Sequence, residues 1–527
     1  MTAEARTDVP ADAIGAPSLT LDEAQLGDLE LLLSGAFAPL TGFMGTADAA
    51  AVIDRGTLAD GTPWPVPVTL DVRPDAVPGD AHRVVLADAE GTPLALLDIA
   101  ERSEIQATRP ARGAGQARLI RLSGPVTGLR EPEHGPFRRL MRRPAEAREA
   151  LGDVPVLAYA TRGPVHGRQI GQLRHMAGQL KARLLLLPLV AGPAEVVTRP
   201  ESLIRAVLAA AASLPPATMV IPVPLAPRGL ASGADSAREL SARALVAAAY
   251  GATHLMADDG PAGAGHAGAR PADATAIPVV RAGDWAYDPG AEVWRPLALI
   301  EAGAERGDLS PGELGDLLDA GAEVPAWFTP PAVARELRRA RPPRAERGFV
   351  LFLTGLSGSG KSTIARNLRD VLAERGDRKV SLLDGDLVRQ VLSAGLTFSR
   401  ADRDLNIVRI GFVAAEIARH GGIAICAPIA PYAEARARVR EMVSEVGDFL
   451  LIHVATPLEV CEVRDRKGLY AKARAGLIDQ FTGISDPYEE PADADLTIDT
   501  STMTREQATG AVLGLLTAGG WLSPAQG

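Results

Sequence analysis

The sequence predicts an α/β protein built from several domains, and three observations support this prediction. Its 527 residues exceed what a single hydrophobic core normally organises, so about three domains are expected. Strand-like apolar runs alternate with Ala- and Leu-rich helical stretches in the middle of the chain. Near residue 355, a glycine-rich segment joins a strand-like run to a helical stretch, which is typical of a parallel sheet that binds phosphate.

The N-terminal part, residues 1–140, has the pattern of a small β-rich domain. Short runs of alternating apolar and polar residues, such as 66–72 and 82–86, are separated by Gly and Pro. Residues 1–17 are rich in Ala, Asp and Pro and have no apolar core of the kind that a signal peptide carries. We therefore expect a cytoplasmic protein.

The central part, residues 141–335, predicts a Rossmann-like α/β domain because strands and helices alternate along it. The expected strands are 154–159, 184–190, 218–223 and 253–257, and the expected helices begin near 167 and span 202–213 and 237–249. Residues 259–273, rich in Gly, Ala and Pro, predict a flexible loop. A basic helix between two Pro pairs, within 329–344, is interpreted as the linker to a last domain at 345–527.

Composition excludes several classes of function. The net charge is −10, so the chain has no basic footprint for nucleic acid and no polybasic membrane patch. The longest apolar run, 184–191, is far shorter than a membrane span. Cys426 and Cys461 are the only cysteines, which excludes a disulfide framework and a cysteine-based zinc site. We expect small-molecule partners and a homo-oligomer, either a dimer or a larger assembly.

The segment 355–363, Gly-Leu-Ser-Gly-Ser-Gly-Lys-Ser-Thr, fits the phosphate-loop pattern G-x-x-x-x-G-K-[ST] and follows the apolar run 349–353. Its glycines let backbone N–H groups surround a polyphosphate at a helix N-terminus. Lys361 is expected to reach the β- and γ-phosphates, and the Ser362 hydroxyl is expected to bind Mg²⁺. The predicted ATP-binding residues here are Gly355, Ser357, Gly358, Gly360, Lys361, Ser362 and Thr363. Lys is rare among the 55 basic residues of this chain, which makes a lysine at this position informative.

Beyond residue 345, the chain resembles adenylylsulfate (APS) kinase over the whole remaining length. The resemblance rests on the phosphate loop and on four further blocks in the family's order, 383–389, 396–410, 467–474 and 481–489. It implies a P-loop kinase with a parallel sheet. The implied reaction transfers the ATP γ-phosphate, with Mg²⁺, to the 3′-hydroxyl of adenylyl sulfate. The product would be 3′-phosphoadenylyl sulfate (PAPS), made in sulfate assimilation.

The resemblance assigns the catalytic roles to Lys361, Asp384 and Asp386. Asp386 would lie near the attacking hydroxyl, orient it and accept its proton. Asp384 would join Ser362 in the metal shell. The alternative interpretation is that both carboxylates are ordinary turn residues beside Gly385.

The resemblance also supplies a substrate site, in which Phe398 and Phe481 would sandwich the adenine of adenylyl sulfate. A core role is the alternative for these two rings. Arg403 and Asn406 lie three residues apart and share a face if they belong to one helix. The implied APS-binding residues are Asp386, Arg389, Phe398, Arg403, Asn406, Ile429, Lys467, Gly468, Leu469 and Phe481.

A basic stretch of this last domain resembles the family's lid over ATP and adenylyl sulfate. It contains Arg464, Lys467, Lys472 and Arg474, and Arg464 is assigned to ATP. A solvated helix face is an equal alternative for the last two. Ala430 stands where many relatives have a serine that is described as a phosphorylated intermediate, so such an intermediate is excluded here.

The first 335 residues resemble ATP sulfurylase (sulfate adenylyltransferase), which implies a PUA-like N-terminal domain and a nucleotidyltransferase-type central domain. The match is good in the scaffold segments 28–44, 250–254 and 324–328. The family motif Gln-Thr-Arg-Asn-Pro-x-His-x-x-His reads Ala-Thr-Arg-Gly-Pro-Val-His-Gly-Arg-Gln at 160–169, so only Arg162 and His166 remain of its chemistry. A second motif, Gly-Arg-Asp-His, falls on Asp-Asp-Gly-Pro at 258–261.

These departures predict that the sulfurylase-like half is inactive, because Asp258 and Asp259 bring negative charge to a triphosphate site. A rearranged loop that uses Arg168 and His266 instead is the alternative. Three hypotheses follow: an APS kinase with a silent sulfurylase-like half, a bifunctional enzyme that makes PAPS from sulfate and ATP, and a sulfurylase whose kinase-like end only binds nucleotide. The intact motif at Lys361 argues against the third.

Overall fold

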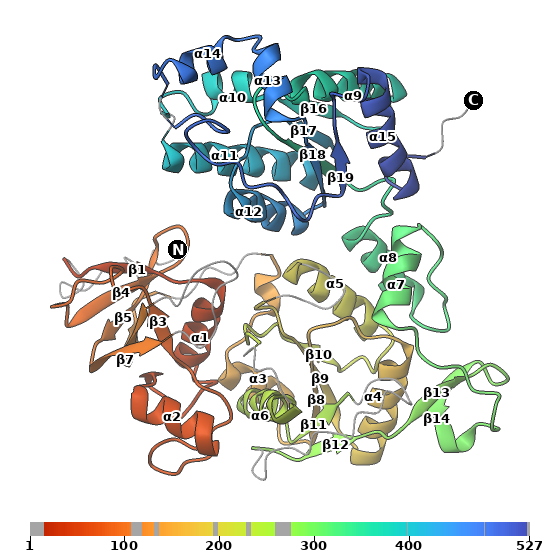
Figure 1. Ribbon diagram of the computed structural model, residues 1–527. Coiled ribbons are helices and arrows are strands. Elements are labelled where there is room, and N and C mark those ends of the chain that lie inside the picture. The colour runs from red at the N-terminus through yellow and green to blue at the C-terminus, as the bar shows by residue number, and fades with distance from the viewer. Residues whose placement is uncertain are drawn as a thin grey trace, which may run out of the picture. The chain divides into compact units, whose positions relative to one another are not determined.

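The computed structural model describes most of the chain and divides it into two compact units (Figure 1). The first unit is Met1–Leu317 with Glu323–Ala340, and the second is Leu318–Ala322 with Arg341–Gly527. The described residues are 15–106, 118–130, 136–192, 199–227, 233–258, 276–397, 399–478 and 480–523, without the side chains of 106, 233–236, 386, 387 and 389.

The first unit begins with a β-rich domain, as predicted. Its seven-stranded sheet has the order β1-β4-β5-β7-β2, and β3 and β6 also pair with β7. The central strand is β7 (Arg118–Gly128), whose length lets several shorter strands pair along it. The other elements are β1 (Ser18–Thr20), α1 (Glu23–Leu33), β2 (Gly42–Phe43), α2 (Thr46–Arg55), β3 (Leu70–Val72), β4 (Arg83–Ala87), β5 (Pro93–Asp98) and β6 (Glu101–Gln106).

The central domain is a five-stranded parallel sheet with the order β10-β9-β8-β11-β12, which confirms the predicted α/β class. The chain winds from β8 to one edge and then returns to form the other half of the sheet. Such an order creates a switch point, where ligands bind at the carboxyl ends of the strands. The strands are β8 (Val156–Thr161), β9 (Arg183–Pro188), β10 (Met219–Val220), β11 (His254–Ala257) and β12 (Val279–Arg281). The helices are α3 (Pro144–Leu151), α4 (Gly167–Leu180), α5 (Pro200–Ala211) and α6 (Gly233–Ala249).

A hairpin of β13 (Trp285–Asp288) and β14 (Val293–Pro296) follows, and then helices α7 (Pro311–Asp319) and α8 (Pro331–Ala340). Helix α8 was predicted to be a linker, and that prediction is wrong. Val333 and Leu337 are fully buried, and Glu336 pairs with Arg205 of α5 at 3.0 Å. Because the two apolar residues lie four apart on one helix face, α8 packs into the first unit like any amphipathic helix.

The second unit includes a short segment from before α8. Asp319 pairs with Arg341 and Arg347, each at 2.6 Å, and with Arg344 at 3.3 Å. Burial alone would raise the pKa of Asp319, but the hydrogen bonds from Arg341 and Arg347 outweigh it and lower that pKa to about 2. The second unit therefore extends beyond the range 345–527 expected for the kinase-like domain, because it also includes Asp319.

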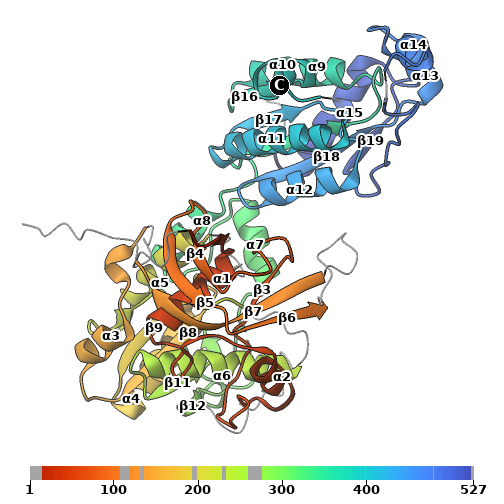
Figure 2. The same ribbon diagram turned by 90° about the vertical axis from the view of Figure 1, so that its left-hand side faces the viewer.

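The second unit is a parallel sheet between two layers of helices (Figure 2). The strand order is β16-β17-β15-β18-β19, and the apolar run predicted to precede the phosphate loop is the fully buried central strand β15. Alternate residues of β15 belong to two cores, one with α9 and α15 and one with α11 and α12. The strands are β15 (Phe349–Thr354), β16 (Val380–Leu383), β17 (Ile423–Cys426), β18 (Asp448–Val454) and β19 (Leu496–Ile498). The helices are α9 (Lys361–Arg375), α10 (Gly385–Val391), α11 (Arg400–Arg419), α12 (Ala433–Ser444), α13 (Leu458–Arg464), α14 (Leu469–Arg474) and α15 (Arg505–Ala518). Across the described parts of both units, no helix is long and apolar enough to span a membrane.

The burial of α8 leads to a testable prediction. Leu337→Ala should lower the free energy of unfolding of the first unit by about 2–5 kcal/mol, because a buried leucine is replaced by a cavity. Arg338→Ala, on the exposed side of the same helix, should change it by less than about 0.5 kcal/mol. Urea unfolding of the two variants provides the comparison, and equal effects would restore the linker interpretation.

Candidate active site

The phosphate loop lies between β15 and α9, at the carboxyl edge of the second sheet. Gly355 and Gly360 have φ angles of 148° and 103°, a region that side chains disfavour. A Cβ on Gly355 would also lie only 2.4 Å from the Val454 carbonyl oxygen. These positions therefore require glycine. The turn directs the chain into the first residue of α9, where backbone N–H groups and the helix dipole favour phosphate.

Lys361 is the buried cation of this loop. Its Nζ donates hydrogen bonds to the carbonyl oxygens of Gly355 at 2.8 Å and Leu356 at 2.7 Å. Burial lowers the pKa of Lys361 to about 8, because a charged amine is poorly solvated inside the protein. A phosphate group that reached Nζ would favour the charged form and reverse this effect. The predicted contact with the β- and γ-phosphates is consistent with this position and stays a prediction.

A set of hydroxyls fixes the outer side of the loop, and the sequence did not indicate it. The hydroxyls of Thr456 and Thr500 lie 3.0 and 2.8 Å from the Ser359 carbonyl oxygen, and the Tyr470 hydroxyl lies 2.9 Å from that of Ser357. Arg464 donates to the Thr500 hydroxyl at 2.7 Å. These bonds occupy the carbonyls of Ser357 and Ser359 and hold the loop from that side. The one sequence feature that could have predicted this role is that Thr456 and Thr500 each follow the carboxyl end of a strand, β18 and β19.

Ser362 and Asp384 lie side by side, as a shared metal shell requires. Their side-chain oxygens are 3.4 Å apart, and Arg366 pairs with the second Asp384 oxygen at 3.1 Å. A hydroxyl and a carboxylate suit Mg²⁺, which takes its remaining ligands from water and substrate phosphates. In the described residues, no group of three or more His, Cys, Asp or Glu side chains could hold a metal. The residues fit the predicted ion.

Arg403 and Asn406, predicted to face the substrate, share one face of α11 and are both buried. Within the described part of the chain, the Nε of Arg403 and the Oδ1 of Asn406 are buried atoms with no hydrogen-bond partner. Unpaired buried polar atoms are costly, and they persist where a ligand completes them. The guanidinium is otherwise held by Asp486, Tyr432 and Thr482.

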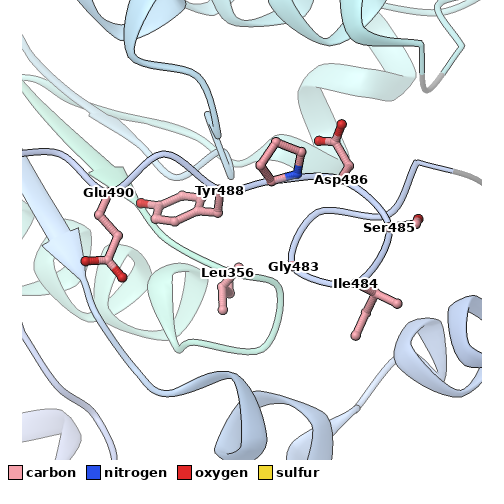
Figure 3. A pocket seen from close by; sticks show the side chains of 8 residues that line it. Leu356, Gly483, Ile484, Ser485, Asp486, Tyr488 and Glu490 are labelled. Atoms are coloured by element: carbon pink, nitrogen blue, oxygen red, sulfur yellow. The ribbon is translucent and has the colours of Figure 1, made fainter.

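An open pocket of about 460 Å³ lies beside the start of the phosphate loop (Figure 3). Its lining is Leu356, Gly483, Ile484, Ser485, Asp486, Pro487, Tyr488 and Glu490. Phe481 precedes this loop and packs edge-on against Tyr470, with ring centroids 5.0 Å apart. The Ile429 carbonyl accepts a hydrogen bond from Thr354 at 2.6 Å, at the same edge of the sheet.

Several further predicted residues belong to the region around α14 or lie outside the described residues. Gly468 has a φ of 65° and immediately precedes α14, where Leu469 begins. Arg474 is exposed and pairs with Glu462 at 2.8 Å, which favours the solvated-face alternative for it. Phe398 and the side chains of Asp386 and Arg389 lie outside the described residues, so their roles stay predictions.

Ala430, at the position of the serine in many relatives, is buried. It is 1% exposed and has a φ of 46°, and its carbonyl accepts a hydrogen bond from Arg436 at 2.8 Å. The methyl group of Ala430 is therefore packed in the interior of the second unit.

In the first unit, Arg162 and His166, the two residues kept from the sulfurylase motif, both contact polar groups of the protein. Arg162 donates to the carbonyl oxygens of Ala191 and Leu225, at 2.9 and 2.8 Å, and pairs with Glu239 at 3.2 Å. His166 is 9% exposed and lies against Phe328, and its Nδ1 is 3.0 Å from the Thr329 hydroxyl oxygen.

Burial, and then the nearby Arg168, lower the pKa of His166 to about 3, so the ring is neutral at physiological pH. A neutral imidazole carries no positive charge, and it donates a hydrogen bond through one ring nitrogen only.

Arg168 follows them on α4 and is bound by two carboxylates. It pairs with Asp258 at 2.9 Å and with Asp308 at 2.8 Å, and its side chain is 3% exposed. Gln169 and Tyr159 each donate a further hydrogen bond to Asp258 at 3.0 Å. Arg168 was considered as a replacement for the missing phosphate-binding groups, but here two acidic side chains already neutralise it. Asp259 and His266 lie outside the described residues.

Comparison with known proteins agrees with this division of the chain. Family models match in the order PUA-like domain (residues 1–114), ATP-sulfurylase (138–340) and adenylylsulphate kinase (347–499). Proteins named sulfate adenylyltransferase from Coccidioides immitis and Aspergillus oryzae are 36% and 37% identical, over 98% and 93% of this chain and 96% and 91% of theirs. The chain belongs to the ATP-sulfurylase and adenylylsulfate kinase fusion family.

Among solved structures, the protein is similar to one titled hexameric APS kinase from Thiobacillus denitrificans. The identity is 36%, the TM-score is 0.74, and the match covers 97% of this chain and 95% of that one. The phosphate loop, the Ser362–Asp384 pair and Arg403 thus belong to the adenylylsulfate kinase domain, and the Arg168 cluster belongs to the ATP-sulfurylase domain.

The lowered pKa of Lys361 predicts a pH-dependent affinity for nucleotide. Below pH 8 the lysine is charged before ATP binds, so affinity is highest there. Above pH 8 binding must also take up a proton, so the Kd of Mg-ATP should rise by up to tenfold per pH unit. Calorimetry at pH 7, 8 and 9, in two buffers of different ionisation enthalpy, measures both effects. A Kd that stays constant to pH 9, with no proton uptake, would contradict the buried-lysine account.

Proposed function

We propose that this protein is an adenylylsulfate kinase that uses ATP to phosphorylate the 3′-hydroxyl of adenylyl sulfate and so makes PAPS. The single observation that carries the proposal is the composition of one sheet edge. There the buried Lys361, the Ser362–Asp384 pair and the Nε of Arg403, which has no partner among the described residues, all come from elements that surround the central strand β15. Phosphoryl transfer needs a cation for the donor phosphates, oxygen ligands for Mg²⁺ and a hydrogen-bond donor for an acceptor anion.

The chain's residues have separable tasks in this proposal. The phosphate loop and Lys361 bind the β- and γ-phosphates, and the hydroxyls behind the loop keep its N–H groups aimed at them. Phe481 and Arg403 hold the acceptor nucleotide, so that its hydroxyl is in line with the γ-phosphate. Asp386, a prediction from the sequence, orients that hydroxyl and accepts its proton. Ser362 and Asp384 would hold Mg²⁺, which when bound neutralises phosphate charge.

We further propose that the ATP-sulfurylase domain forms little or no adenylyl sulfate. Asp258 follows β11 at the carboxyl edge of the central sheet, where a nucleotide would bind in this fold. Arg168 with Asp258 and Asp308 leaves one negative charge in excess at this edge. A unit charge pair at 4 Å is worth about 4 kcal/mol at an effective dielectric of 20, so the cluster disfavours a triphosphate. Arg162 and Arg168 are already paired with acidic residues.

The second candidate is a bifunctional enzyme that makes PAPS from sulfate and ATP. It is favoured by the name sulfate adenylyltransferase that relatives carry at 36% and 37% identity. For assembly, we propose a homo-oligomer, on the basis of the hexameric relative that matches over 97% of this chain. Light scattering on the purified protein measures this directly.

The kinase proposal predicts that Lys361→Ala abolishes PAPS formation and leaves the fold intact, because the loop loses its buried cation. Less than a tenth of wild-type turnover should remain. Lys379→Ala is the matched control, since this exposed lysine lies just before β16 and away from the phosphate loop. A coupled assay with ATP and adenylyl sulfate gives the rates, and substantial turnover by the Lys361 variant would remove this site from the mechanism.

The proposal for the first unit predicts no sulfate-dependent pyrophosphate release from ATP, even when pyrophosphatase pulls the reaction forward. The same preparation should make PAPS from added adenylyl sulfate, which shows that the protein is active. His166→Ala is the diagnostic variant. Pyrophosphate release that needs sulfate and is lost in this variant would establish the bifunctional candidate instead.

A further inference from the structure

Three side chains that have no assigned role in substrate binding hold the guanidinium of Arg403. Its Nη1 donates to Asp486 Oδ2 at 2.9 Å and to Thr482 Oγ1 at 3.1 Å, and its Nη2 donates to the Tyr432 hydroxyl at 2.7 Å. The Tyr432 hydroxyl in turn donates to the same Asp486 oxygen at 2.8 Å. Three side chains from two distant loops thus meet at one guanidinium.

Burial makes this network consequential. Arg403 and Tyr432 are 8% and 1% exposed, and the side chain of Asp486 is 15% exposed. A buried guanidinium needs an anionic partner, because the cost of removing it from water is otherwise several kcal/mol. Arg400 adds to the packing, with its guanidinium carbon 4.2 Å from the Tyr432 ring centroid. The hydrogen bonds to Asp486, Thr482 and Tyr432 therefore fix the orientation of the Arg403 guanidinium plane.

The anchored guanidinium of Arg403 keeps its Nε as an unused donor among the described atoms. Arginine has five N–H donors, and the three network bonds use only those on the two terminal nitrogens. Among the described atoms, Nε stays buried and unpartnered, one turn of α11 before the similarly unpartnered Oδ1 of Asn406. A planar guanidinium whose two terminal nitrogens are anchored holds its remaining Nε–H donor in a single orientation.

The loop that anchors Arg403 also carries the predicted adenine-stacking ring. Backbone N–H groups of Ile484, Ser485 and Asp486 all donate to the Phe481 carbonyl, at 3.0, 3.0 and 3.1 Å. In Figure 3 the Asp486 side chain points away from Leu356 and Ile484, which lie on the other side of this loop. The tight turn therefore connects Phe481 at its start to the arginine anchor at its end.

We propose that Asp486, with Tyr432 and Thr482, is a positioning residue for the acceptor nucleotide. It orients Arg403 and ties that guanidinium to the Phe481 ring as one preformed acceptor site. The inference rests on the proposed kinase function, since it assigns Arg403 to adenylyl sulfate. It concerns the acceptor, because in the described residues the hydrogen bonds of Lys361, Thr456 and Thr500 that hold the phosphate loop do not involve Arg403, Asp486, Tyr432 or Thr482.

The test is steady-state kinetics of the full-length protein with each substrate varied in turn. Asp486→Asn should raise the KM for adenylyl sulfate at least tenfold, with kcat and the KM for ATP within twofold of wild type. Tyr432→Phe removes one link of the network and should raise the same KM about threefold. Glu489→Gln is the matched control, because this carboxylate of the same loop caps α12 through the Ala433 N–H at 2.7 Å and does not contact Arg403.

A double-mutant cycle separates positioning from general stability. If Asp486 acts through Arg403, then adding Asp486→Asn to Arg403→Lys should raise the KM for adenylyl sulfate less than threefold further. Multiplicative effects, or equal effects on the KM of both substrates, would overturn the inference. If Asp486→Asn does not fold, Tyr432→Phe decides, and an unchanged KM for adenylyl sulfate in that variant overturns the inference too. Failure of the wild-type protein to make PAPS would instead reject the kinase proposal itself.

Discussion

The second unit depends on one constraint: a lysine ammonium is buried in the loop after its central strand, and no carboxylate of the described residues is among its hydrogen-bond partners. Lys361 is satisfied by the carbonyls of Gly355 and Leu356, and this requires the loop to curl back on itself. Curling requires backbone angles that only glycine adopts easily, and it turns the N–H groups to the opposite side. The hydroxyls of Thr456 and Thr500 then hold the remaining carbonyls, so strands β18 and β19 are part of the same arrangement.

The two nucleotide-type sheets treat their cations in opposite ways. In the second unit, Arg403 is anchored on one side and keeps a buried Nε without a partner among the described atoms. In the first unit, Arg168 lies between Asp258 and Asp308. An arginine between two carboxylates gains little from a phosphate, because the phosphate must first displace them and then bear their repulsion. The same residue type is thus anchored on one side in the second unit and neutralised by two carboxylates in the first.

The connection between the units shows how local pattern and packing can disagree. Proline pairs and a run of arginines around α8 are typical of a linker, yet Val333 and Leu337 are buried in the first unit. The arginines that follow, Arg341 and Arg347, bind Asp319 in the second unit. Two of the basic residues that suggested a linker thus form ion pairs with the Asp319 carboxylate.

The sequence by itself determined the fold class of all three domains and the location of the phosphate loop. Both follow from local rules: hydrophobic periodicity distinguishes strands from helices, and the glycine spacing admits one kind of turn. The tertiary structure alone decided which polar atoms are satisfied. Asp486 lies 83 residues from Arg403 in the chain, and Asp308 lies 140 residues from Arg168. No local pattern connects such pairs, because a charge is neutralised by whatever the fold brings within about 3 Å of it.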